Sequence, residues 1–222
     1  MDLALDMNVH NLVSQLVAGM VTSIEIFLLT LLFSLPLGLL IAFVRMSKNS
    51  FLQFLAKVYI SVMRGTPLML QLMVVYFSPF YIFGVKITPS YRFIAVIIGF
   101  SLNYAAYFAE IYRAGIESIA PGQWEAAQLL GYSKAATFFR IIFPQVIKRI
   151  LPPVTNEVIT LVKDTSLAFV IAVSEMFTQA KAIAAAQANI MPFVAAGLFY
   201  YVFNVLVAFV MGRIEKKLSY FN

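Results

Sequence analysis

The sequence predicts an all-α integral membrane protein that crosses the bilayer with about five transmembrane helices. Only 12% of its 222 residues are charged and 62% are hydrophobic, whereas charged residues make up roughly a quarter of a soluble domain. The charges are also unevenly placed, because residues 26–44, 65–85 and 193–212 contain none. Each of these tracts approaches the ~20 residues that a helix needs to cross a bilayer.

Hydropathy, helix caps and helix breakers divide the chain into individual spans within a single transmembrane domain, residues 1–222. We expect spans at about 17–44, 56–82, 92–115, 148–173 and 193–213. Apolar tracts of this length favour helices over barrel strands, since a lipid-exposed backbone must satisfy its own hydrogen bonds. The polar, alanine-rich segment 174–192 is expected to be a short external helix or a plain connector.

Basic residues in the connectors predict the orientation. One side of the predicted topology carries Arg45, Lys48, Arg113, Lys134, Arg140, Lys148, Arg149, Arg213, Lys216 and Lys217. The other side carries only Lys86, Arg92 and Lys181. Since cytoplasmic loops are enriched in Lys and Arg, the N-terminus is expected outside and the C-terminus in the cytoplasm.

Composition also argues against several other classes. The net charge of +6 follows from this topological bias and from attraction to anionic lipid, so no nucleic-acid partner is expected. The chain has no cysteine and a single histidine, His10, which we interpret as a solvated terminal residue rather than a metal ligand or catalyst. The N-terminal stretch lacks the basic region of a signal peptide, so no cleaved presequence is expected.

The connector at 116–147 is too regular for a plain loop. Ala, Glu and Leu dominate 123–130, which predicts a short helix that Gly131 ends as a C-cap. Ser133 is a suitable N-cap for a second helix from about 134 to 143. Two short helices with apolar residues on one face would make a compact cytoplasmic knob suited to a groove in a partner protein.

Four motifs in this chain resemble those of binding-protein-dependent ABC importer permeases, in particular the polar amino-acid uptake family. They are Glu125-Ala126-Ala127 with Gly131, Ile141 and Phe143-Pro144; Arg64-Gly65-Thr66-Pro67 with Gln71; the run from Tyr107 to Ile116; and Lys163-Asp164-Thr165-Ser166-Leu167. The first resembles the EAA signature, in which Leu usually stands where this chain has Phe143. The resemblance covers about residues 17–215.

The resemblance implies that the knob is a coupling element that docks on a cytoplasmic ABC ATPase subunit. The residues it assigns to this coupling are Gln123, Glu125, Ala126, Ala127 and Gly131. The alternative is an amphipathic loop helix lying in the membrane interface and anchored by Trp124.

The resemblance further implies a non-catalytic subunit of a transport complex in a bacterial or archaeal cell (inner) membrane. No phosphate-binding GxxxxGK[ST] sequence occurs, so we expect no cofactor on this chain and ATP with Mg on the partner ATPase. A second permease copy in a homodimer, or a homologous permease, is expected because five spans enclose a path poorly. An external substrate-binding protein and the lipid bilayer complete the expected partners.

Ionisable residues at bilayer depth suggest functional sites. Arg64 and Glu110 lie in motifs that recur through the family, and we interpret them as structural. Glu110 and Arg113 are three residues apart, which predicts an ion pair on one helix face.

The fourth predicted span is the most polar. Glu157 and Asp164 are seven apart and fall within about 20° on a helix, with Thr160 between them. Asn156 and Lys163 form a neighbouring stripe.

We hypothesise that Glu157, helped by Asp164 and Asn156, binds a basic amino acid (arginine, lysine or histidine) near the membrane midplane. Candidate contacts also include Thr160, Lys163 and, on the first span, Glu25. The alternative is that Glu157 bonds a neighbouring helix while the external protein selects another polar amino acid, such as glutamine. A stand-alone secondary carrier is less favoured, because no inverted repeat is visible.

Overall fold

The computed structural model describes residues 2–218, with side chains described from Asn11 onward, so the expectation for His10 lies outside the described side chains. Its elements are α1 (Asp2–Arg45), α2 (Ser50–Gly65), α3 (Leu68–Phe83), α4 (Tyr91–Glu117), α5 (Pro121–Leu129), α6 (Lys134–Thr137), the π-helix η1 (Phe138–Ile142), α7 (Phe143–Asp164), the 3₁₀ helix η2 (Thr165–Ile171), α8 (Met176–Gln187) and α9 (Met191–Leu218). Every regular element in this range is helical, which confirms the all-α class.

Three helices in the described range are long and apolar enough to cross a membrane. They are Asn11–Arg45, Tyr91–Glu117 and Met191–Leu218, and α2 with α3 would make a fourth span if this bent pair is one crossing. The fourth predicted span, 148–173, coincides with most of α7 and all of η2. It does not qualify by apolarity because charged residues recur along α7.

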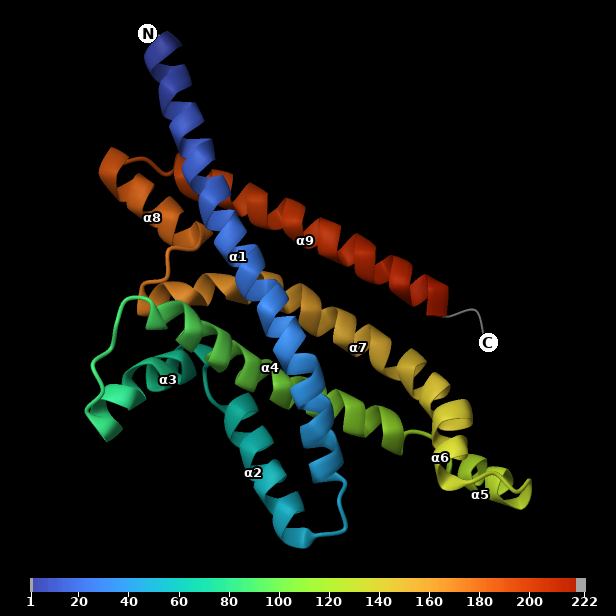
Figure 1. Ribbon diagram of the computed structural model, residues 1–222. Helices are drawn as coiled ribbons and strands as arrows, with labels where there is room; N and C mark the ends of the chain where they lie inside the picture. Colours follow the sequence, from blue (N-terminus) through green and yellow to red (C-terminus); the bar gives the residue numbers. More distant parts are fainter. Residues whose placement is uncertain (1, 219–222) are drawn as a thin grey trace.

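Helix α4 forms the centre of the bundle, with α1 packed most extensively against it and α2, α3 and α7 also in contact, while α9 packs on α7 and α8 (Figure 1). Gly38 allows the close approach of α1 to α4, since a Cβ there would lie 2.8 Å from the Cβ of Phe108. The largest core cluster joins α1, α3, α4 and α7, with Ile26, Leu72 and Phe100 among its members. This arrangement places one side of α7 against α4, where the polar residues of both helices meet.

The segment predicted as one span at 56–82 is broken in the structure. Helices α2 and α3 meet at an angle of 112°, with Thr66 and Pro67 in extended conformation between them. Proline has no N–H and disfavours a helical residue before it, so the helix ends there. Side-chain amides satisfy the freed carbonyls: Gln71 Nε2 donates to the Thr66 carbonyl at 3.1 Å, and Asn103 Nδ2 donates to the Met63 carbonyl at 3.1 Å.

The knob has the two predicted caps but not the predicted second helix. Gly131 adopts φ +78°, and the amide of Tyr132 donates to the Ala127 carbonyl at 3.0 Å, as in a Schellman C-cap. Ser133 Oγ accepts from the Ala136 amide at 3.2 Å. However, the helix begun at Lys134 does not end near 143.

The helix that begins at Lys134 instead continues through η1 into α7. A proline ring crowds the carbonyl four residues earlier, and for Pro144 that residue is Arg140, which lies inside the widened π turn. The backbone accommodates the proline by widening, with the Phe143 amide donating to the Phe138 carbonyl, rather than by stopping. The knob and α7 are therefore joined by continuous helix.

Candidate functional site

The polar face of α7 brings its two carboxylates into different surroundings. Tyr104 of α4 donates its hydroxyl to Asp164 Oδ2 at 2.7 Å. Tyr104 is only 2% exposed, so Asp164 is fixed to the core of the bundle. Glu157, seven residues before Asp164 on α7, is half-buried and makes no hydrogen bond or ion pair with any residue that the structure describes.

Glu157 lines a cavity of about 360 Å³ between α2, α4 and α7. Its lining comprises Arg64, Tyr107, Glu110, Ile111, Ala114, Gly115, Ser118, Arg149, Pro153 and Glu157. The volume lies in the range of small-molecule sites, roughly 300–1,000 Å³. The cavity thus combines apolar walls with charges of both signs.

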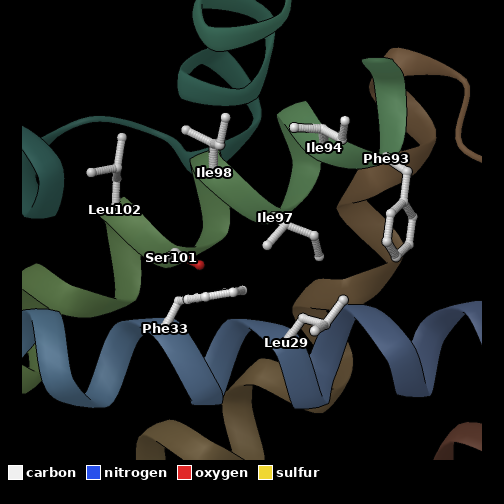
Figure 2. A pocket seen from close by; sticks show the side chains of 8 residues that line it. All are labelled: Leu29, Phe33, Phe93, Ile94, Ile97, Ile98, Ser101 and Leu102. Atoms are coloured by element: carbon white, nitrogen blue, oxygen red, sulfur yellow. The ribbon is translucent and has the colours of Figure 1, made fainter. Parts of the chain in front are cut away.

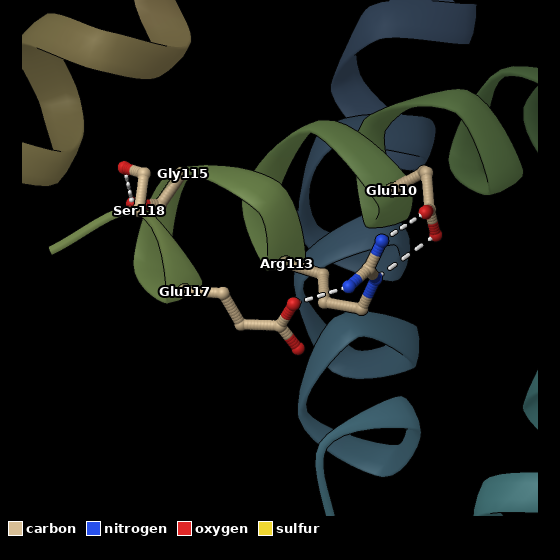
Figure 3. A network of polar contacts seen from close by, with 5 residues as sticks. All are labelled: Glu110, Arg113, Gly115, Glu117 and Ser118. Carbon is tan, nitrogen blue, oxygen red and sulfur yellow. Dashed lines mark hydrogen bonds and ion pairs between the residues drawn. The ribbon is translucent and has the colours of Figure 1, made fainter.

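Two of the four charged residues that line this cavity, Glu110 and Arg149, already have partners. Glu110 pairs with Arg113, and Arg113 also pairs with Glu117 one turn further on (Figure 3). The predicted ion pair between Glu110 and Arg113 is therefore confirmed. Arg149 donates through Nη1 to the Ser118 carbonyl.

Arg64 differs from its neighbours. It lies in the last turn of α2, just before the break, with its guanidinium carbon 5.3 Å from the centre of the Tyr107 ring. Among the described residues it has no hydrogen-bond or ion-pair partner. Arg64 and Glu157 are the two charged residues of the lining with neither a hydrogen bond nor an ion pair to any described residue.

The other predicted site residues do not line this cavity. Asn156 and Lys163 are exposed on a different side of α7, and Thr160 donates its hydroxyl to the Asn156 carbonyl at 2.9 Å. Glu25 is exposed on α1. The structure therefore brings Glu157 together with Arg64 and Glu110, and not with the residues we grouped with it from the sequence.

A second cavity, of about 490 Å³, lies between α1 and α4 and has a different character. Figure 2 shows Leu29 and Phe33 of α1 facing the α4 residues Ile97 and Ser101 across it. Apart from the Ser101 hydroxyl, its side chains are hydrocarbon, so it suits a lipid chain and offers no charge to a polar solute.

The knob presents its coupling residues unequally. Gln123, Glu125, Ala126 and Gly131 are exposed, whereas Ala127 is only 2% exposed. Trp124 stacks on Phe138, with ring centres 6.4 Å apart, so it packs within the knob. Leu129 and Leu130 are 89% and 76% exposed, which leaves an apolar surface on the knob.

Sequence reasoning missed Glu175, which is fully buried at the start of α8. Its carboxylate accepts from the amides of Phe177 and Thr178 at 2.6 and 2.8 Å, and from the Tyr200 hydroxyl at 3.1 Å. An acidic residue followed three positions later by Thr, before an alanine-rich run, is the signal that could have located it. No local sequence pattern could have identified Tyr104, because its hydrogen-bond partner Asp164 lies 60 residues away.

Comparison with known proteins gives a consistent result. The family model described as "Binding-protein-dependent transport system inner membrane component" matches residues 34–220. The chain is 36% identical over 204 residues to the putative glutamine transport system permease protein GlnP of Rickettsia bellii, which covers 91% of this chain and 92% of that relative.

Two relatives from Bacillus subtilis carry other substrate names. The L-cystine transport system permease protein TcyB is 38% identical, covering 90% of this chain and 85% of its own. The arginine transport system permease protein ArtQ is 37% identical, covering 90% and 91%.

Solved structures agree on the fold. A crystal structure of an amino acid ABC transporter with histidines superposes with a TM-score of 0.86 at 31% identity, covering 95% of this chain and 97% of that one. A bacterial alginate ABC transporter, at 15% identity and TM-score 0.67, shares the fold alone. The resemblance drawn from the sequence motifs is confirmed: the chain belongs to the family of binding-protein-dependent transport system inner membrane components, as an amino-acid ABC permease.

Proposed function

We propose that this chain is the permease subunit of an ATP-driven importer whose cargo is a basic amino acid, namely arginine, lysine or histidine. The observation that carries the proposal is the Glu157 carboxylate, which lines a cavity of the bundle without a hydrogen-bonding partner among the described residues. An unpaired charge at bilayer depth is costly, and a cationic solute would compensate it. The names of the arginine permease relative and of the transporter structure with histidines support the same class.

The second candidate is an importer of another polar amino acid, with selectivity set by an external binding protein. The relatives named as glutamine and L-cystine permeases favour it, at similar identity. In that case Glu157 would meet the α-ammonium group that all amino acids share, and would not discriminate between side chains.

Uptake by the complete complex in proteoliposomes separates the two. With Glu157→Gln we expect arginine uptake, as kcat/KM, to fall at least about tenfold, since a hydrogen bond to a charged group contributes roughly 1.5–3 kcal/mol. Glutamine uptake should be unchanged. Glu25→Gln, an exposed carboxylate outside the cavity, is the matched control. Unchanged arginine affinity and selectivity in Glu157→Gln would refute the basic-cargo proposal.

The remaining partners follow from family membership and are proposals for this chain. Exposed Gln123, Glu125 and Ala126 would contact the ATPase, whereas buried Ala127 and left-handed Gly131 would shape the knob. A second permease, identical or homologous, would cover the exposed polar side of α7. The excess of basic residues on one side supports a cytoplasmic C-terminus and an external N-terminus.

Docking is testable by copurification in mild detergent. An ATPase subunit should copurify with the wild-type chain and be lost with Glu125→Lys, which reverses a charge on the exposed face of the knob. Lys134→Gln, on the same knob but outside the assigned set, is the control. Retention of the ATPase and of transport-coupled ATP hydrolysis in Glu125→Lys would contradict docking through this face.

A further inference from the structure

Two opposite charges face the same cavity without meeting. Arg64 enters from α2 and Glu157 from α7, and both line the 360 Å³ space. No ion pair within 4.0 Å joins them, and neither bonds another described residue. Long charged side chains that border one cavity in a membrane protein would be expected to pair. Their separation leaves one positive and one negative pole across a space of ligand size.

We propose that Arg64 binds the α-carboxylate of the transported amino acid while Glu157 faces its cationic group. The inference rests on the proposed function and adds a positively charged partner for the substrate carboxylate, which Glu157 cannot bind. An amino acid carries a carboxylate and at least one cation, so it matches both poles at once. The carboxylate and the cation of the bound amino acid would neutralise Arg64 and Glu157, and a basic side chain would bring one further positive charge into the cavity.

The contact with Tyr107 leaves Arg64 suited to this role. The guanidinium carbon lies over the Tyr107 ring, 5.3 Å from its centre, in a cation–π contact that needs no hydrogen bond from the group. The N–H donors of a guanidinium lie in its plane and form a fork that matches a carboxylate. The aromatic contact therefore holds the group while its donor edge stays available.

The other cations near the cavity are less suited. Arg113 is occupied by Glu110 and Glu117, and Arg149 donates to the Ser118 carbonyl. Lys163 is exposed and is not part of the lining. Among the cations of the lining, Arg64 is the one that donates no hydrogen bond to any described residue.

Matched ligands test the assignment directly. L-arginine and L-argininamide differ in replacing the carboxylate by an uncharged amide, so their affinity ratio reports on the carboxylate contact. Calorimetric binding to the purified permease–ATPase complex, without the external binding protein, should be measured for wild type, Arg64→Gln, Arg149→Gln and Glu157→Gln. Arg64→Gln should weaken arginine binding at least about tenfold and change argininamide binding less than about twofold.

The controls give distinct patterns. Glu157→Gln should weaken both ligands alike, because both keep the cationic groups, and Arg149→Gln should leave the ratio as in wild type. Equal weakening of both ligands by Arg64→Gln would show a structural or gating role and overturn the proposal. The proposal would also be overturned if Arg149→Gln, and not Arg64→Gln, removed the preference for arginine over argininamide. Should Arg64→Gln fail to fold, Arg64→Lys must still lower the ratio, since it keeps the charge but loses the bidentate fork.

A parallel pair, L-glutamine and L-glutamine amide, keeps this inference separate from the proposed cargo. If wild type binds glutamine and not arginine, the basic-cargo proposal fails, while an Arg64-dependent ratio for the glutamine pair still supports the carboxylate contact. If wild type binds neither carboxylate ligand better than its amide, the assignment of Arg64 is overturned whatever the cargo.

Discussion

Glu175 and Glu157 are both glutamates in the C-terminal half of the chain, but they differ in burial and in hydrogen bonding. Glu175 is fully buried and accepts hydrogen bonds from two backbone amides and two hydroxyls, those of Thr178 and Tyr200. Glu157 is half-buried at a cavity and accepts none from the described residues. Buried polar groups in proteins are almost always satisfied, so the satisfied carboxylate belongs to the architecture and the unsatisfied one is available to a ligand.

The strongest test of this contrast is Glu175→Ala. The change removes the N-cap of α8, worth about 0.5–2 kcal/mol, and leaves buried hydroxyls unpaired at a cost of about 1–3 kcal/mol. We expect a loss of about 2–4 kcal/mol in stability. It would appear as a clear fall in the temperature at which the detergent-solubilised protein loses its monodisperse peak on size exclusion.

Glu157→Ala is the matched comparison for that measurement. It removes a carboxylate of equal length with no hydrogen bonds to lose, so stability should stay within about 0.5 kcal/mol of wild type. If both variants lose stability equally, the distinction between a structural and a ligand-facing carboxylate fails.

Tyr104→Phe probes the intermediate case, a carboxylate with a single side-chain partner. Its hydroxyl donates to Asp164 at 2.7 Å, and a hydrogen bond to a charged group is worth about 1.5–3 kcal/mol. We expect a smaller loss of thermal stability than for Glu175→Ala. A double-mutant cycle with Asp164→Asn isolates the pairwise contribution, and additive effects in that cycle would show that the two groups do not interact.

Local features were predictable from the sequence and distant ones were not. The Gly131 cap, the Ser133 cap and the Glu110–Arg113 pair depend on residues within a few positions, and each was confirmed. The break between α2 and α3 was missed, because the largely apolar segment 56–82 reads as one span even with Pro67 inside. Of the side chains that make the break tolerable, Gln71 is local to Thr66, whereas Asn103 comes from α4, 40 residues from Met63.

The same limit applies to the site. The stripe spacing identified Glu157 and Asp164 as neighbours in direction, but it could not separate them. What separates them is Tyr104 on α4, which bonds only Asp164, and Arg64 on α2, which shares a cavity only with Glu157. Helix periodicity predicts which way a side chain points and says nothing of what stands opposite.

Because α6, η1 and α7 form one continuous helical segment, a movement of the knob would be transmitted along it to Glu157. Glu157 lies 23 residues beyond the start of α6, which corresponds to a rod of about 35 Å at 1.5 Å per residue. A tilt of about 10° at the knob would then displace the far end by roughly 6 Å. Two stretches interrupt the regular hydrogen bonding of this helix between Lys134 and Asp164, the π turn at 138–142 and the Pro152–Pro153 pair, which lacks two N–H donors. They are therefore the points at which it bends most easily.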